Sequence, residues 1–224
     1  RRLIDSVRSG NVDLAVVPLA AFGEIAPRFR FFEIPFLFKD PWHFRMVQLD
    51  YREQLKMLED LRAKGLEGIG WLSGEPLVIA SRKPILEPTD LRDLRTATYS
   101  ALDIGETSAV ELFKNKLGAV PIQTPRNRAM ADLRSGKIDV LEIELTELGR
   151  LRPQQLSVLL TNHLYNGYVV IANPARWAAL PSNMKDSFVR QLQRTNDRIH
   201  EELADAVDSA RRELKQAKGV SLIS

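Results

Sequence analysis

A helix that ends at glycine and leads into a short apolar strand occurs twice in this sequence, and this pattern constrains the fold most. The first copy passes through SGNVD (9–13) into residues 14–17, and the second passes through SGKID (135–139) into residues 140–141. Glycine permits the left-handed turn that ends many helices, and a short apolar strand is typical of a parallel sheet covered on both faces. One copy of the unit is expected in each of two lobes.

The rest of the chain continues this alternation of strands and amphipathic helices, so the predicted fold class is α/β. A long last helix is predicted to begin at Ser182 and to end before Gly219. Its apolar positions recur at helical spacing and form the stripe expected to be buried: Phe188, Val189, Leu192, Ile199, Leu203, Val207 and Leu214.

Composition excludes several classes of protein. The chain has no Cys, so it holds neither disulfides nor a thiolate metal site. Its apolar runs are far shorter than the roughly 20 residues of a membrane-spanning helix. The net charge is +3, but basic residues alternate with acids, which disfavours a nucleic-acid partner. Because residues 1–7 already resemble the middle of a helix, we expect that earlier segments, including a signal peptide, have been removed.

No catalytic constellation is present in the sequence, so no enzyme activity, cofactor or metal is predicted. The three histidines, His43, His163 and His200, lie far apart and lack metal-ligand spacing. Glu142 and Glu144 alternate on a strand and point to one face, as a carboxylate pair does, although a solvated strand end is the favoured interpretation. For His163, a structural role with satisfied hydrogen bonds is favoured over a site role.

Seven segments occur in an order that points to one family: GNVDLA (10–15), IPFLFKD (34–40), PILEPTDLRDL (84–94), LGAVP (117–121), ADLRSGKID (131–139), TNH (161–163) and WAALP (177–181). Together they resemble the dicarboxylate-type (DctP family) substrate-binding proteins of TRAP transporters, the tripartite ATP-independent periplasmic systems. The resemblance covers nearly the whole chain, and it implies that a first strand and helix and a final C-terminal segment are missing.

The resemblance implies a two-lobed periplasmic-binding-protein fold with hinge crossovers and one long helix along both lobes. The expected bounds are 1–73 with 167–206 for lobe I, and 74–166 with 207–224 for lobe II. A small organic ligand would bind in the cleft, and closure would deliver it from the periplasm to the membrane permease subunits of the transporter.

The chain departs from the family at the positions that hold the ligand. The strand arginine that pairs with the ligand carboxylate in the family is replaced by Ala97, and a second arginine is replaced by Pro76. A family asparagine is matched by Ile143, and a polar position after the first strand is matched by Pro18. Because a buried carboxylate without donors costs several kcal/mol, the ligand is expected to be more apolar than a dicarboxylate.

Arg126, at a position that is aromatic in the family, is the candidate replacement anchor for the ligand carboxylate. The expected ligand site is Pro18, Trp71, Pro76, Ala97, Tyr99, Arg126 and Ile143. Arg126 in a solvated helix-capping loop remains an equal alternative, and Trp71 and Tyr99 in the core are equally open. The alternative function is a relative of this fold that serves signalling or binds a protein partner without transport.

Overall fold

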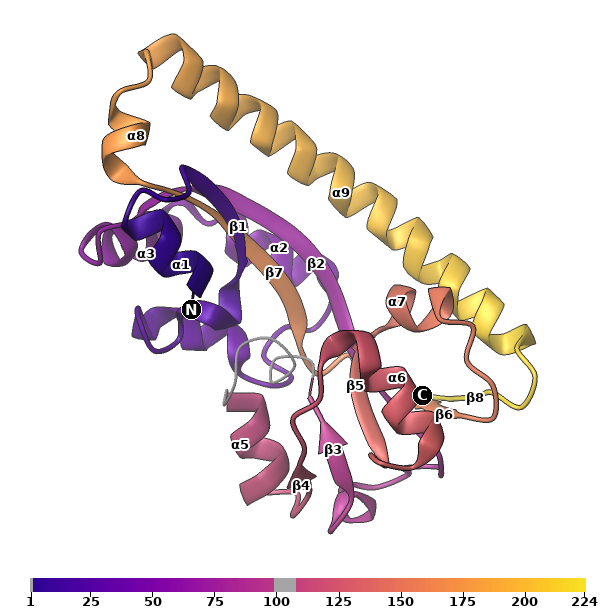
Figure 1. Cartoon of the computed structure of the whole chain (residues 1–224). Helices are drawn as coiled ribbons and strands as arrows, with labels where there is room; N and C mark the ends of the chain where they lie inside the picture. The colour runs from indigo at the N-terminus through magenta and orange to yellow at the C-terminus, as the bar shows by residue number, and fades with distance from the viewer. Residues whose placement is uncertain (1, 99–107) are drawn as a thin grey trace. The chain divides into compact units, whose positions relative to one another are not determined.

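A computed structural model describes residues 2–98 and 108–224, which form two compact units (Figure 1). The described residues of unit 1 are 2–32, 38–74 and 165–203, and those of unit 2 are 33–37, 75–98, 108–164 and 204–224. The sequence placed residues 33–37 in lobe I, whereas they belong to unit 2. One cause is the backbone of Phe36, whose N–H donates to the carbonyl oxygen of His163 at 2.7 Å.

Unit 1 contains a sheet covered by short helices. Its elements are α1 (Arg2–Arg8), β1 (Leu14–Pro18), η1 (Leu19–Phe22), η2 (Pro27–Glu33), α2 (Pro41–Leu49), α3 (Tyr51–Arg62), the first half of β2 (Glu67–Ser81), β7 (Tyr165–Ala172), α8 (Pro174–Ala178) and the first part of α9 (Ser182–Gln216). Strand β1 pairs with β7 in antiparallel register, from Leu14 opposite Ala172 to Pro18 opposite Tyr168, and β7 is followed in the sheet by β2.

Aromatic side chains fill the interior of unit 1. Phe38 contacts Phe44 edge-on, with ring centroids 4.9 Å apart, and Phe44 stacks on Tyr165 at 5.6 Å. Phe29 stacks on Trp71 at 5.8 Å. Offset and edge-on contacts of this kind add to the free energy that burial of each ring contributes.

Unit 2 is built on a second stretch of sheet. Its elements are the rest of β2, η3 (Pro88–Leu91), β3 (Arg95–Ala97), α5 (Ser108–Asn115), β4 (Val120–Pro121), α6 (Arg126–Ser135), β5 (Val140–Glu144), α7 (Leu145–Arg150), β6 (Ser157–Leu159), the end of α9 and β8 (Ser221–Ile223). Strand β2 pairs antiparallel with β5 and β6, whereas β5–β3, β3–β4 and β6–β8 are parallel. The pairing is therefore mixed, where the sequence pattern predicted parallel strands.

The two faces of this sheet differ in what they pack against. Ile143 pairs with Val78, and both enter a core cluster with Ala97 of β3 and Leu133 of α6. The opposite face carries Ile79 and Val140, which pack against Ile85, Leu91, Phe113 and Ala119. Glu142 lies on this second face because it pairs with Ile79.

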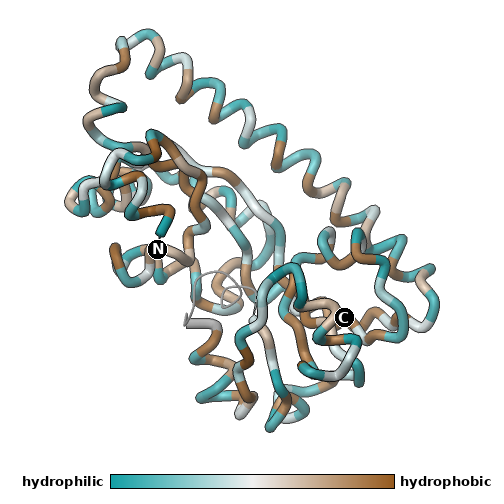
Figure 2. The backbone as a smooth tube through the Cα atoms, in the orientation of Figure 1, coloured by the Kyte–Doolittle hydropathy of each residue, from teal (hydrophilic) through white to brown (hydrophobic). Residues whose placement is uncertain are grey.

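The long helix α9 is present as predicted, and the α/β fold class is confirmed. Its residues 182–203 belong to unit 1 and residues 204–216 to unit 2. Hydrophobic and hydrophilic residues alternate along its length (Figure 2), and Leu214 is 1% exposed as expected. The rest of the stripe is less buried than predicted. Phe188 is 39% exposed, with its ring centroid 5.6 Å from that of Trp177. The other members are half-buried: Val189, Leu192, Ile199, Leu203 and Val207.

The sequence pattern between residues 40 and 61 predicts one helix, but the structure has two. Asp50 separates α2 from α3 with an extended backbone (φ −64°, ψ 109°), and its carboxylate accepts a hydrogen bond from the Arg52 N–H at 2.9 Å. Asp is favoured at such a boundary because its short side chain satisfies an N–H at the start of a helix. No helix among the described residues combines the length and apolar run that crossing a membrane requires.

Candidate functional site

The candidate site in unit 2 is centred on Arg126, the first residue of α6. Its Nε and Nη2 atoms lie 3.3 and 2.6 Å from the two carboxylate oxygens of Glu147, in a fork arrangement. Its Nη2 also lies 3.5 Å from the carboxylate of Glu144, the last residue of β5. The Arg126 side chain is 36% exposed, so the guanidinium is oriented by two carboxylates and is still accessible to solvent.

Glu75, the first residue of unit 2 on β2, lies close to this charged group. It is 4% exposed, and its carboxylate accepts hydrogen bonds from the N–H of Thr146 at 3.0 Å and from the Thr146 hydroxyl. Burial raises the pKa of Glu75 above its ordinary value, and the nearby charge of Glu144 raises it further, although the Thr146 hydrogen bonds oppose the shift. Arg150 also reaches this group, because its Nη2 donates to the Thr146 hydroxyl at 3.4 Å and its charge opposes the rise in the Glu75 pKa.

A second polar group lies on the same face of β5. The imidazole Nε2 of His163 is 2.7 Å from Glu142, and Nδ1 is 2.6 Å from the hydroxyl of Thr161. Glu142 is 0% exposed and His163 4%. In the neutral imidazole, Nε2–H donates to the carboxylate and Nδ1 accepts from the hydroxyl. The structural interpretation of His163 is confirmed, whereas the solvated strand end expected for Glu142 and Glu144 is wrong, because pairing with β2 buries both.

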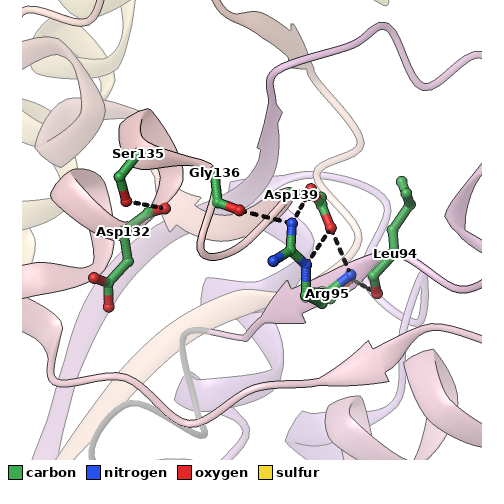
Figure 3. A network of polar contacts seen from close by, with 7 residues as sticks. Leu94, Arg95, Asp132, Ser135, Gly136 and Asp139 are labelled. Carbon is green, nitrogen blue, oxygen red and sulfur yellow. Dashed lines mark hydrogen bonds and ion pairs between the residues drawn. The ribbon is translucent and has the colours of Figure 1, made fainter.

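The start of β3 is fixed by an arginine–aspartate pair (Figure 3). Asp139 accepts from the backbone N–H of Arg95 at 3.1 Å and from its Nε and Nη2 atoms at 2.8 Å each. Nη2 also donates to the carbonyl oxygen of Gly136 at 2.6 Å. These contacts join β3 to the turn between α6 and β5, so the SGKID segment positions the strand that carries Ala97.

Besides Arg126, the structure places three of the sequence-predicted site residues inside unit 2. Ala97 and Ile143 are brought together in one hydrophobic cluster, with exposed fractions of 0% and 4%. Pro76 is buried in β2, next to Glu75. The three positions that carry polar groups in the resembled family are therefore apolar and packed in this chain.

The other predicted residues belong to unit 1 or lie outside the described residues. Pro18 ends β1 and is half-buried, opposite Tyr168. Trp71 of β2 is 6% exposed and stacks on Phe29, which supports the core interpretation that the sequence left open for it. Tyr99 lies outside the described residues. Arg126 itself is the first residue of α6 in unit 2, and its side chain pairs with Glu147 and Glu144.

Sequence reasoning missed Glu147 as the partner of Arg126, and it missed the contact between Glu75 and Thr146. These residues come from β2 and α7, more than fifteen residues from Arg126 in the chain, and only strand pairing brings them close. A usable signal was present in the run Glu142, Glu144 and Glu147, where carboxylates alternate with apolar residues at the end of a strand. Among the described residues, no group of three or more His, Asp or Glu side chains is arranged to hold a metal ion.

Comparison with known proteins identifies the family. All 224 residues match the family of bacterial extracellular solute-binding proteins, family 7, also called DctP. The chain belongs to this family. The membership inferred from seven sequence segments is confirmed, and a family 7 protein is a solute-binding protein rather than an enzyme.

Two curated relatives and one solved structure illustrate the likeness. The chain is 25% identical to the C4-dicarboxylate-binding periplasmic protein DctP of Rhodobacter capsulatus, over 87% of this chain and 57% of that protein. It is 28% identical to the 2,3-diketo-L-gulonate-binding periplasmic protein YiaO of Escherichia coli, over 85% of this chain and 57% of the relative. This family 7 chain therefore matches little more than half the length of these relatives.

A TRAP periplasmic solute-binding protein from Pseudomonas aeruginosa PAO1, solved with bound L-malate, has the same fold. The TM-score is 0.84 at 18% identity, and the match covers 99% of this chain and 76% of that one. At this identity the likeness concerns the fold of the family 7 chain, and the ligand requires a separate argument.

Proposed function

We propose that this chain is the capture component of a TRAP-type transporter in the periplasm, and that its ligand is a small organic acid more apolar than a dicarboxylate. Family membership along the whole chain supports the binding role. The named relatives bind dicarboxylates, a diketo sugar acid and L-malate, all of which carry at least one carboxylate. A shared need for one carboxylate anchor is the starting point for the ligand assignment.

Arg126 is the proposed carboxylate anchor. Its guanidinium is 36% exposed and is held in a fixed plane by Glu147 and Glu144. A planar guanidinium can pair with carboxylates on more than one edge, which a lysine ammonium cannot do with the same geometry. An anchor that is already oriented loses less side-chain freedom when the ligand binds, which favours affinity.

The apolar replacements limit the ligand to one such anchor. Ala97, Pro76 and Ile143 are buried and carry no side-chain donor. A second ligand carboxylate would gain no hydrogen bond from these three side chains, and the acidic groups of Glu75 and Glu144 would repel it. An unpaired carboxylate costs several kcal/mol, which is enough to reverse the preference for a dicarboxylate. The observation that carries the ligand assignment is therefore the accessible guanidinium of Arg126 in a unit whose three family-polar positions are apolar and buried.

Closure of the two lobes on the ligand completes the proposed mechanism. A ligand that contacts both lobes in the closed state binds that state better, and this difference in affinity shifts the population toward closure. The permease subunits would then recognise the closed, loaded form. Of the remaining predicted positions, Pro18 and Tyr99 are proposed to contact the ligand, whereas Trp71 belongs to the core.

Isothermal titration calorimetry of the purified chain tests the ligand class. The probes are phenylacetate as an aromatic monocarboxylate, and succinate and L-malate as dicarboxylates. Phenylacetate is expected to bind more tightly than either dicarboxylate. Replacement of Arg126 by Gln is expected to weaken phenylacetate binding by roughly tenfold or more, the loss of one charge-assisted pair.

Arg128 supplies a matched control, because it lies on the same helix with an exposed side chain. Arg128→Gln removes the same charge from α6 and is expected to leave the affinity unchanged. Arg126→Lys keeps the charge and is expected to restore only part of the affinity. Tight succinate binding that Arg126→Gln does not change would contradict the proposed ligand class.

A further inference from the structure

Unit 2 contains a concave pocket that is lined mainly by apolar side chains and does not include Arg126. This pocket has a volume of about 210 Å³ and lies between β2, the residues around η3, α5 and β6. The lining residues are Phe36, Ile79, Ile85, Leu86, Glu87, Pro88, Leu91, Leu112, Phe113, Leu117, Leu159, Thr161 and His163. Concave apolar sites with a few polar groups are the usual form of small-molecule pockets.

Phe36 forms one wall of this apolar pocket in an unfavourable conformation. Its φ angle is +61°, a left-handed value that a bulky side chain rarely adopts. The hydrogen bond from its N–H to His163 holds it there, and the Phe36 ring centroid lies 6.2 Å from that of His163. The side chain is nevertheless 68% exposed, so burial in the chain itself does not compensate for the strain. Strained residues of this kind concentrate at ligand contacts.

The floor of the apolar pocket offers little to a charged ligand. His163 and Thr161 hydrogen-bond to each other, and the second imidazole nitrogen faces Glu142. Neither Lys nor Arg occurs among the thirteen lining residues, while Glu87 contributes a carboxylate. An anionic ligand would therefore lose its hydration without gaining a cationic partner. Phe113 meets the His163 ring edge-on at 6.1 Å, so two phenylalanines flank the imidazole.

We propose that this pocket binds a small neutral aromatic molecule with a single ring. An engineered apolar cavity of roughly 150 Å³ accepts benzene, so a pocket of about 210 Å³ accommodates a ring with one or two small substituents. Aromatic walls and the absence of a cation among the lining residues select a neutral ring over an acid. The site lies within unit 2 and does not depend on the ligand assigned to Arg126.

Methyl-resolved NMR of the whole chain tests this proposal, with toluene, phenol and benzoate as probes. Toluene and phenol are expected to give saturable shifts at the methyl groups of Ile79, Ile85 and Leu117. Benzoate has the same ring with a carboxylate, and it is expected to bind at these methyl groups at least about tenfold more weakly, because desolvating its charge has no compensation. Failure at these methyl groups is distinguishable from failure of the acid site, which calorimetry at Arg126 reports.

Two variants and one control complete the experiment. Leu112→Trp, at a half-buried position on α5, fills the pocket, and Leu86→Glu, at a position 72% exposed, adds a charge at its edge. Leu112→Trp is expected to weaken toluene binding about tenfold or more, because the indole takes the space of the ring. Leu86→Glu is expected to weaken it measurably less, because the position is largely exposed. Leu151→Glu changes a leucine that is 39% exposed in unit 2 but does not line the pocket, and it should bind toluene as the parent does.

Circular dichroism checks that each variant is folded. Because the two pocket variants lie at different positions, the proposal can still be tested if one of them misfolds. Absence of saturable shifts with toluene and phenol would overturn the proposal. So would benzoate binding as tight as toluene binding at the same methyl groups, or weakening by Leu151→Glu equal to that by Leu86→Glu.

Discussion

Removing the imidazole of His163 should destabilise unit 2 strongly, because Glu142 is buried beside it. The exposed fractions of the two side chains are 4% and 0%, and their nearest atoms are 2.7 Å apart. His163→Leu fills similar space but leaves the carboxylate without its imidazole hydrogen bond. Breaking a buried pair from one side typically costs about 3–5 kcal/mol, because the remaining group keeps its desolvation penalty.

The double variant Glu142→Leu/His163→Leu separates this explanation from simple loss of packing. Replacing both partners with apolar side chains also removes the buried carboxylate that has lost its imidazole hydrogen bond, so the double variant is expected to be more stable than His163→Leu alone. An exposed pair serves as the control: Arg198 and Glu202 are each 70% exposed on α9, with 3.5 Å between their atoms. Arg198→Ala should change the free energy of unfolding by only about 0.5 kcal/mol or less.

Urea unfolding followed by far-UV circular dichroism measures these free energies. The three tryptophans, Trp42, Trp71 and Trp177, all belong to unit 1, so tryptophan fluorescence would report mainly on the other unit. A loss below about 1 kcal/mol for His163→Leu with an unchanged m-value would refute the reasoning. Equally damaging would be a double variant whose loss equals the sum of the two single losses.

Two further predictions concern β2. Glu75→Gln should stabilise the protein increasingly as the pH rises from about 4 to 7.5. Burial raises the pKa of Glu75, so the stability that the protonated carboxyl contributes is present at low pH and is lost as the pH rises through the folded-state pKa. Urea unfolding of both proteins at the two pH values measures the difference. An equal gain in stability at both pH values would contradict the prediction. Gly74→Ala should cost about 1–3 kcal/mol, because the new Cβ would lie 2.4 Å from the Asn166 carbonyl oxygen. Gly68→Ala should lower the free energy of unfolding less, because its Cβ would lie 2.3 Å from a Leu58 methyl carbon that can move. Thermal melts of both variants measure this, and the reverse order would refute the argument.

Local sequence patterns predicted the elements whose signals are local. Gly10 and Gly136 have φ angles of +78° and +76°, the left-handed values that the two helix-ending glycines were expected to adopt. The long helix was predicted from its own periodicity. The break at Asp50 was missed because the apolar spacing of the region fits one helix as well as two. The short strand β8 was missed because only its partner β6 makes it a strand.

The candidate site was predictable only in part, since its contacts join distant segments. Arg126 was singled out because it replaces an aromatic residue of the resembled family, but nothing local pointed to Glu147 as its partner. The burial of Glu142 depends on its pairing with Ile79 of β2 and on His163, twenty-one residues away. A strand end with alternating carboxylates reads as solvated until the neighbouring strand and the histidine are known.

Neither unit is a continuous piece of chain, and this has a consequence for synthesis on the ribosome. Unit 1 includes residues 182–203 of α9, and the β6 edge of unit 2 is paired by Ser221–Ile223. A nascent chain that has emerged as far as residue 160 therefore holds most of both cores but the complete set of partners for neither. Translation products truncated before residue 221 should accordingly be more sensitive to protease than products that include Ser221–Ile223, because the β6 edge lacks its partner in them.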